Sequence, residues 1–161
     1  MCSHYRAPYD VTRVKLFGIS DFDAAWRPET WPQYEAPAIW RADAVEHSRQ
    51  AFLGQLGLMP RWAHDAGFGK RTYNARTETA AEKASFRDAW RKGQRCIIPA
   101  EWFYEPCYET GKAVRWKIAR ADGAPWFLAA LQPPKANDVA SKCFKLGLPQ
   151  PRDQVSSNLA V

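Results

Sequence analysis

The fold of this chain is decided by one stretch in its second half, Arg95-Cys96-Ile97-Ile98-Pro99-Ala100-Glu101-Trp102-Phe103-Tyr104-Glu105. Short runs of β-branched and aromatic residues are typical of strands, so the stretch predicts one strand over 95–100 and another over 102–105. Similar runs predict strands over 114–119 and 126–131. Several short strands with few helices indicate an α+β fold in which neighbouring strands pair antiparallel.

The segments around this stretch predict its turns and one helix. Gly111 predicts a turn between two of the strands, and Ala121-Asp122-Gly123 predicts a hairpin turn before the last one. Upstream, Thr79 followed three residues later by Glu82 is a capping-box pattern, which predicts the start of a helix. This helix carries Phe86 and Trp90 on one face, and Gly93 ends it.

The first half of the chain carries weaker patterns. Residues 1–43 are rich in Pro and Trp, which predicts short strands and turns, with one strand over 37–41. Residues 44–55 are compatible with a helix. Residues 56–62 read as a strand that enters a loop.

The composition is that of one globular domain with a basic surface. A chain of 161 residues is long enough to bury a core without disulfides or a metal. Hydrophobic residues make up 46% of it, aromatic residues 14%, and the formal net charge is +6. Such a charge favours polyanionic partners without identifying one.

Cysteine and histidine spacing gives no sign of a metal site. Cys2, Cys96, Cys107 and Cys143 contain no CxxC pair, and the three histidines form no ligand pair with them. We therefore expect neither a metal nor a cofactor. No apolar run reaches the roughly 18 residues of a membrane span, so we expect a cytoplasmic, reduced protein without a membrane partner, and a monomer.

Cys2 is the residue with the clearest chemistry. It follows the initiator methionine directly, and removal of Met1 would leave one residue with a free α-amine and a thiol. Both groups titrate around pH 8, so both are available as nucleophiles near neutral pH. An aldehyde condenses with such an amine, and the sulfur then closes a thiazolidine ring. A frayed terminus without function is the alternative reading of the same residue.

Several motifs in order resemble one known family. They are Cys2, the segment Leu56-Gly57-Leu58-Met59-Pro60-Arg61-Trp62-Ala63, the segment Asn74-Ala75-Arg76-Thr77-Glu78-Thr79, and the stretch over 95–105. Together they resemble the SOS-response-associated peptidase (SRAP) family over residues 1–131. The resemblance implies a mostly antiparallel, barrel-like sheet with a few helices. It also implies a protein of the DNA damage response that binds single-stranded DNA and traps abasic sites in a covalent crosslink.

The resemblance assigns roles to individual residues. Cys2, Asn74 and Glu105 match catalytic positions, with Cys2 as the nucleophile and Glu105 as the group that moves protons. Five residues are implied to contact DNA, with Trp62 stacking on a base and the others binding phosphates. These five are Arg61, Trp62, Lys70, Arg71 and Arg76. When bound to DNA, the protein would be associated with the nucleoid.

The chain departs from the family pattern after residue 131. The family's C-terminal catalytic histidine has no match, so we expect a partial SRAP domain over 1–131, an irregular tail over 132–161 and slow crosslinking. His4 is a poor substitute for the missing histidine. Two further functions stay open: a thiol (auto)peptidase that uses Cys2, and a non-catalytic remnant that binds single-stranded DNA.

Overall fold

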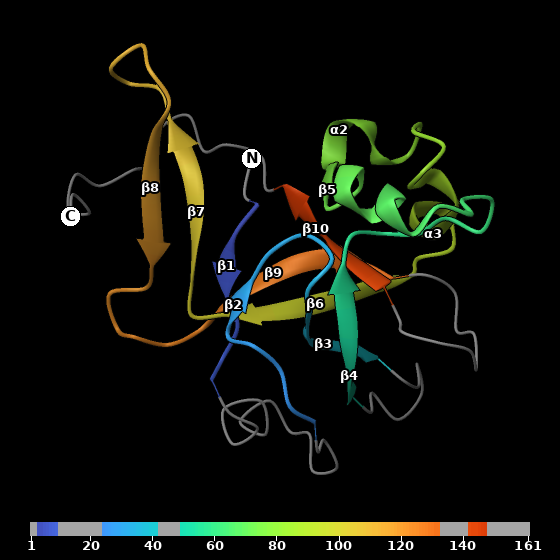
Figure 1. Ribbon diagram of the computed structural model, residues 1–161, viewed down its shortest axis with the longest axis horizontal. Helices are drawn as coiled ribbons and strands as arrows, with labels where there is room; N and C mark the ends of the chain where they lie inside the picture. The colour runs from blue at the N-terminus through green and yellow to red at the C-terminus, as the bar shows by residue number, and fades with distance from the viewer. Residues whose placement is uncertain (1–2, 10–23, 42–48, 133–141, 148–161) are drawn as a thin grey trace.

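The chain folds as two antiparallel sheets with short helices (Figure 1). The structure is a computed structural model that describes residues 3–9, 24–41 and 49–132, together with the backbone of 142–147. Its elements are β1 (Tyr5–Arg6), β2 (Glu29–Thr30), β3 (Glu35–Arg41), β4 (Arg49–Leu56), η1 (Ala66–Arg71), β5 (Asn74–Arg76), α2 (Thr77–Ala80), α3 (Arg87–Arg91), β6 (Arg95–Ala100), β7 (Trp102–Cys107), β8 (Val114–Ala119), β9 (Trp126–Leu131) and β10 (Lys142–Gly147).

The larger sheet is curled, and its strand order is β4-β3-β6-β9-β10-β5. Its pairs are antiparallel except at β10, which runs parallel to β4 and to β5. The first residues of β10 pair with the end of β4, and its last residues pair with β5. The strand β10 also pairs with β9. Strand-to-strand pairing therefore runs from β4 through β3, β6, β9 and β10, and the last of these pairs with β4 again.

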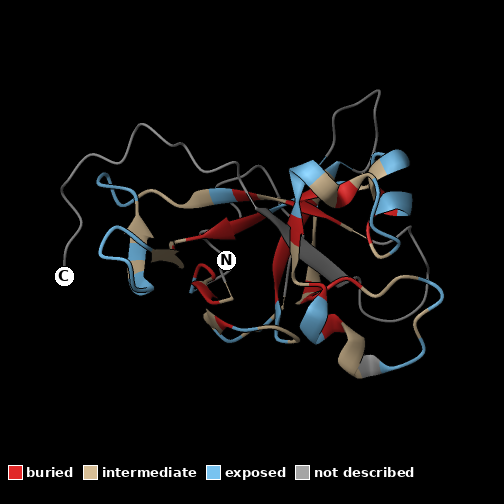
Figure 2. Ribbon diagram, turned by 90° about the horizontal axis from the view of Figure 1, so that it is seen from above, coloured by how far each residue is buried: buried red, intermediate tan, exposed pale blue. Residues whose placement is uncertain are grey.

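The core lies against the strand β6 of this sheet. Cys96, Ile98 and Ala100 alternate along β6 and are buried, while Ile97 between them is 36% exposed. Ile98 lies opposite Leu128 of β9, and both are 1% exposed. Burying one such side chain contributes about 1.5–3 kcal/mol, so the β6–β9 pair is a main source of stability. Figure 2 shows these central strands as the buried part of the molecule.

The smaller sheet has the order β2-β1-β7-β8. Its longest pair is the β7–β8 hairpin, in which Trp102 lies opposite Ala119 and Cys107 opposite Val114. Gly111 has a φ of 76° in the turn between them, a conformation that residues with a side chain rarely adopt. Together the two sheets confirm an α+β fold with mostly antiparallel pairing.

Several local predictions are confirmed. The strands over 37–41, 95–100, 102–105, 114–119 and 126–131 are present within β3, β6, β7, β8 and β9. Gly93 has a φ of 63° just after α3, as expected of a residue that ends a helix. Phe86 and Trp90 both pack in one hydrophobic cluster, which also contains Leu58, Ala89 and Leu131.

Three local predictions are wrong. Residues 49–55 form β4 rather than a helix, because they pair along the whole of β3; residues 42–48 lie outside the described residues. The helix expected from Thr79 to Trp90 is two short helices, α2 and α3. The capping box is absent because α2 begins at Thr77, directly after β5, so Thr79 already lies inside it and its hydroxyl is buried without a hydrogen-bond partner.

The third error concerns the turn at Ala121-Asp122-Gly123. The turn exists, and Gly123 has a φ of 70°. It joins β8 of the smaller sheet to β9 of the larger one, so it is a connection between sheets and no hairpin turn. The strand β10 lies beyond residue 131, where the sequence shows no strand pattern. The division of the chain at residue 131 stays a prediction.

Candidate functional site

The strand β1 holds the N-terminal segment between two other strands. Tyr5 lies opposite Thr30 of β2 on one side and Phe103 of β7 on the other. The amide of Tyr104 donates to the carbonyl of His4 at 3.1 Å, so the antiparallel register with β7 continues one residue before β1. Tyr5 is 3% exposed. The backbone of the chain is therefore fixed from His4 onward, two residues after Cys2.

Alternation along these strands separates two faces of the smaller sheet. Tyr5, Thr30 and Phe103 point into the core and are buried. The opposite face is built from side chains that the pairing places side by side. We call it the aromatic–cationic face, and its residues are His4, Arg6, Glu29, Trp31, Trp102, Tyr104, Arg115 and Lys117.

His4 is the centre of the aromatic–cationic face and is 7% exposed. Its ring stacks on Trp31, with centroids 4.0 Å apart and planes 11° apart, and it meets the edge of Trp102. Nε2 lies 2.5 Å from a carboxylate oxygen of Glu29. Nδ1 contacts the guanidinium of Arg115. Because a guanidinium has only donors, Nδ1 accepts this hydrogen bond and the ring proton lies on Nε2, toward Glu29.

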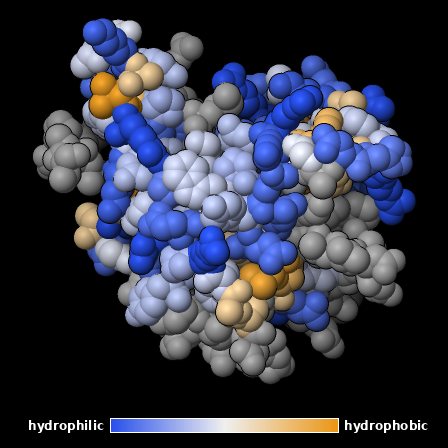
Figure 3. Space-filling view, viewed as in Figure 1, coloured by the Kyte–Doolittle hydropathy of each residue, from blue (hydrophilic) through white to orange (hydrophobic). Residues whose placement is uncertain are grey.

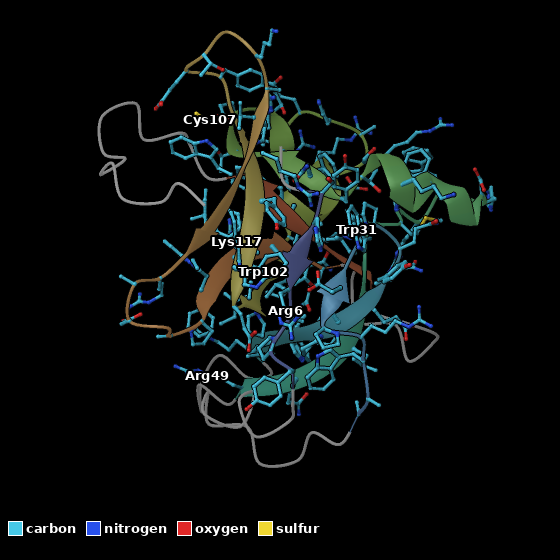
Figure 4. The ribbon with its side chains drawn as sticks, turned by 60° about the vertical axis from the view of Figure 1, so that its left-hand side comes forward. Arg6, Trp31, Arg49, Trp102, Cys107 and Lys117 are labelled. Atoms are coloured by element: carbon cyan, nitrogen blue, oxygen red, sulfur yellow. The ribbon has the colours of Figure 1, made fainter. Side chains whose placement is uncertain are left out.

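Ion pairs and ring contacts extend this network across the sheet. Arg6 donates to Glu29 at 2.9 Å and to Glu101 at 3.1 Å. On the other side of His4, the guanidinium carbon of Arg115 lies 3.8 Å from the ring centroid of Tyr104. Lys117 Nζ lies 4.8 Å from that of Trp102, and Figure 4 shows Lys117, Trp102 and Arg6 close together. The first strand is thus held by side chains from β2, β7 and β8.

The predicted catalytic residues lie on different elements. Cys2 lies outside the described residues. Glu105 is half-buried in β7 opposite Trp116, and it follows the residue that binds His4. Asn74 is half-buried at the beginning of β5, in the other sheet. In Figure 1 the beginning of β1 lies between the ends of β7 and β10, and β10 pairs with β5 at Asn74.

The five predicted DNA-binding residues are all exposed. Trp62 is 51% exposed and packs edge-on against Phe68 of η1, with ring centroids 5.0 Å apart. This contact brings Arg61 and Trp62 to η1, whose last turn carries Lys70 and Arg71. Arg76 ends β5. The side of the molecule seen in Figure 3 is mostly hydrophilic, with small separate hydrophobic patches.

Close backbone packing holds the loop that carries Arg61 and Trp62. Gly57 has a φ of 126°, and its backbone passes close to that of Gly69 in η1. The hydroxyl of Thr72 donates to the carbonyl of Leu58 at 2.6 Å and is buried. The first residues of the loop after β4 are therefore anchored to the end of η1 and to the residue that follows it.

The sequence did not point to the network around His4. His4 is two residues from Cys2, which is the one signal available before the structure. Glu29, Trp31 and Arg115 are distant in sequence, and only the pairing of β2, β1, β7 and β8 brings them to His4.

A family model described as SOS response associated peptidase (SRAP) matches residues 1–144. The chain belongs to the SRAP family. A crystal structure of a protein from Bordetella bronchiseptica is 36% identical to this SRAP chain, with a TM-score of 0.72, over 90% of this chain and 71% of that one. A crystal structure of a protein from Bacteroides thetaiotaomicron has the same fold, with a TM-score of 0.69 at 19% identity, over 90% of this chain and 67% of that one.

Curated relatives of this SRAP chain are similar over shorter stretches. "Abasic site processing protein YoqW" of Bacillus subtilis is 53% identical over 55 residues, which are 33% of this chain and 24% of that protein. "Abasic site processing protein HMCES" of Rattus norvegicus is 34% identical over 82 residues, which are 46% of this chain and 23% of that protein. The aligned part therefore spans about a quarter of these relatives.

The described part of this SRAP protein has neither a metal-binding cluster nor a membrane-spanning helix. Within that part, no three His, Cys, Asp or Glu residues are grouped so that they could hold a metal ion. No helix there is long and apolar enough to cross a membrane.

Proposed function

We propose that this protein processes abasic sites in single-stranded DNA, and that Cys2 forms the covalent bond to the damaged sugar. The SRAP family model and the names of the YoqW and HMCES relatives support abasic-site processing. One structural observation carries the proposal to this chain. The carbonyl of His4 accepts a hydrogen bond from the amide of Tyr104 in β7, and Glu105 is the next residue of that strand. Two residues of extended chain span at most about 7 Å, which keeps Cys2 within reach of this end of β7.

The reaction that we propose needs only the terminal residue and the aldehyde of the sugar, and it releases one water. After Met1 is removed, the α-amine of Cys2 adds to the aldehyde carbon of the ring-opened sugar, and loss of water leaves an imine. The thiol of Cys2 then adds to the imine carbon, its proton goes to the nitrogen, and a thiazolidine ring closes. Overall, one aldehyde and one aminothiol give one thiazolidine and one water.

Other side chains of the chain would assist these steps. Glu105 of β7 would deliver a proton to the departing hydroxyl and accept one from the amine. Asn74 would orient the sugar, and Arg76, two residues along β5, would bind a neighbouring phosphate. Arg61, Lys70 and Arg71 extend the cationic surface, and the exposed ring of Trp62 offers a stacking surface for a base.

A denaturing gel tests this function directly. Purified protein is incubated with a single-stranded oligonucleotide that carries one abasic site, and a band of protein plus DNA that survives denaturation is expected. Cys2→Ala should remove the band, and Glu105→Gln should slow its formation by about 10²-fold or more. Intact-mass measurement of the protein should show the loss of Met1.

Two results would contradict the proposal. One is a band that persists in Cys2→Ala. The other is a folded wild-type protein, freed of Met1, that binds the oligonucleotide only in a salt-sensitive and non-covalent way.

A further inference from the structure

We infer that the aromatic–cationic face of the smaller sheet binds undamaged single-stranded DNA that continues from the reacting sugar. The inference rests on the proposed function, because Cys2 would place the sugar at the start of β1, beside this face. It adds a second contact surface, separate from the one formed by Arg61, Trp62, Lys70, Arg71 and Arg76. Those residues lie in the loop after β4, on η1 and on β5, whereas the aromatic–cationic face belongs to β2, β1, β7 and β8.

The charges of this face are unevenly paired. Its one carboxylate is engaged, because Glu29 binds His4 and Arg6, and Glu101 beside the face also binds Arg6. Among the described residues, Arg115 and Lys117 form no ion pair with a carboxylate. Both are exposed. The face thus carries cations whose counter-charge is missing, which is the complement of a phosphate backbone.

Aromatic rings lie under these cations. The guanidinium carbon of Arg115 lies 3.8 Å from the ring centroid of Tyr104 and 5.6 Å from that of Trp31, so the cation sits between two aromatic rings. Trp31 is 38% exposed, and His4 fixes its orientation from one side. Lys117 has a flexible stem that can leave Trp102 and reach a phosphate. Outward-facing aromatic side chains with neighbouring cations on an antiparallel sheet are a common platform for single-stranded nucleic acid.

The geometry also explains why an extended strand fits better than a compact anion. The rings and cations come from four strands and gather around His4, where the guanidinium carbon of Arg115 lies 5.6 Å from the ring centroid of Trp31. Adjacent strands are about 4.8 Å apart, so the backbone beneath the face spans roughly 14 Å, the length of a few nucleotides. Lys117 of β8 lies over Trp102, beside this cluster, so one phosphate would contact only part of the face.

Equilibrium binding of a fluorescent, undamaged oligothymidine to the full chain tests the inference. Lys117→Ala should weaken binding and reduce the slope of log affinity against log salt by about 0.7, the contribution of one phosphate on a single strand. Trp31→Leu should weaken binding about tenfold, and Trp31→Phe should restore most of it. Melting curves confirm that the variants fold.

Matched controls come from the same hairpin. Lys112 and Tyr108 are exposed residues at the β7–β8 turn, away from the face. Lys112→Ala and Tyr108→Leu should leave both affinity and salt slope nearly unchanged. Equal losses for Lys112→Ala and Lys117→Ala would overturn the inference, because they would reflect net charge alone. Unchanged binding in folded Lys117→Ala and Trp31→Leu would overturn it as well.

The outcome is separable from that of the proposed function. Binding of the undamaged strand requires no reaction at Cys2, whereas the gel assay with an abasic oligonucleotide does. If the wild-type protein crosslinks while Lys117→Ala and Trp31→Leu bind the undamaged strand normally, the inferred DNA-binding surface is refuted and the proposed function stands. If the wild-type protein never crosslinks but both variants lose binding of the undamaged strand, the proposed function is refuted and the inferred surface stands.

Discussion

The backbone of Gly57 passes so close to Gly69 that a Cβ atom at residue 57 would lie 2.3 Å from the carbonyl oxygen of Gly69. Gly57 also has a φ of 126°. Gly57→Ala should therefore destabilise the protein by more than about 2 kcal/mol, because backbone atoms must move and the new residue is strained. Urea unfolding measures the change.

Gly123→Ala is the control for this substitution. Gly123 also has a positive φ, 70°, but nothing lies within 4 Å of a Cβ built there. The control should lose only about 1–2 kcal/mol, the cost of the left-handed conformation. Similar losses in the two variants would show that the approach of Gly57 to Gly69 is unimportant.

His4→Phe should slow crosslinking and lower stability. Phenylalanine keeps the stacking on Trp31 but removes the hydrogen bonds to Glu29 and Arg115, which are partly buried there. We expect a loss of about 1–3 kcal/mol in the free energy of unfolding. The crosslinking rate, measured well below the melting temperature, should fall because the segment before β1 is less firmly held. The exposed His64 provides a control, and a rate unchanged in His4→Phe would refute the positioning role.

Ile98→Ala and Ile97→Ala form a pair that tests the inward and outward sides of β6. Ile98 is 1% exposed and faces Leu128, whereas Ile97 is 36% exposed. The first substitution should cost about 2–5 kcal/mol because it leaves a cavity, and the second should cost much less. Equal costs measured by thermal unfolding would place the two side chains in similar surroundings and contradict the observed alternation.

The turn after β8 predicts a measurable titration. Arg120 donates to the carboxylate of Asp122, as does the amide of Ala124, and these hydrogen bonds lower the pKa of Asp122 to about 2. Because the folded pKa lies below the unfolded one, the contribution to stability is present above about pH 4 and is lost as the pH falls toward 2.

NMR titration of the Asp122 carboxyl group should give the lowered midpoint. Arg120→Gln should move the midpoint back toward the ordinary value, because the larger of the two causes is removed. A midpoint in the wild-type protein at the value of an isolated aspartate would mean that this hydrogen bond does not persist in solution.

Local pattern was enough for the strands around Ile98 and Tyr104, because alternating buried side chains and turn glycines are encoded within a few residues. It failed for residues 49–55, where pairing with β3 overrides the helical pattern. It also failed for Thr79, whose role depends on where β5 ends. The site shows the same division. Arg61, Trp62 and Arg76 were expected at a DNA-binding surface from the resemblance to the SRAP family alone, whereas the contacts of His4 with Glu29 and Arg115 require three strands that are distant in sequence.

The position of β10 in the larger sheet constrains how the protein is made. During translation β4, β5 and β9 leave the ribosome before Lys142–Gly147, the strand that pairs with all three. Until then the nascent chain exposes backbone donors and acceptors on those strands, and such intermediates are prone to aggregate. Yield in the cell should thus depend on chaperone supply and on the rate at which the codons for Lys142–Gly147 are read.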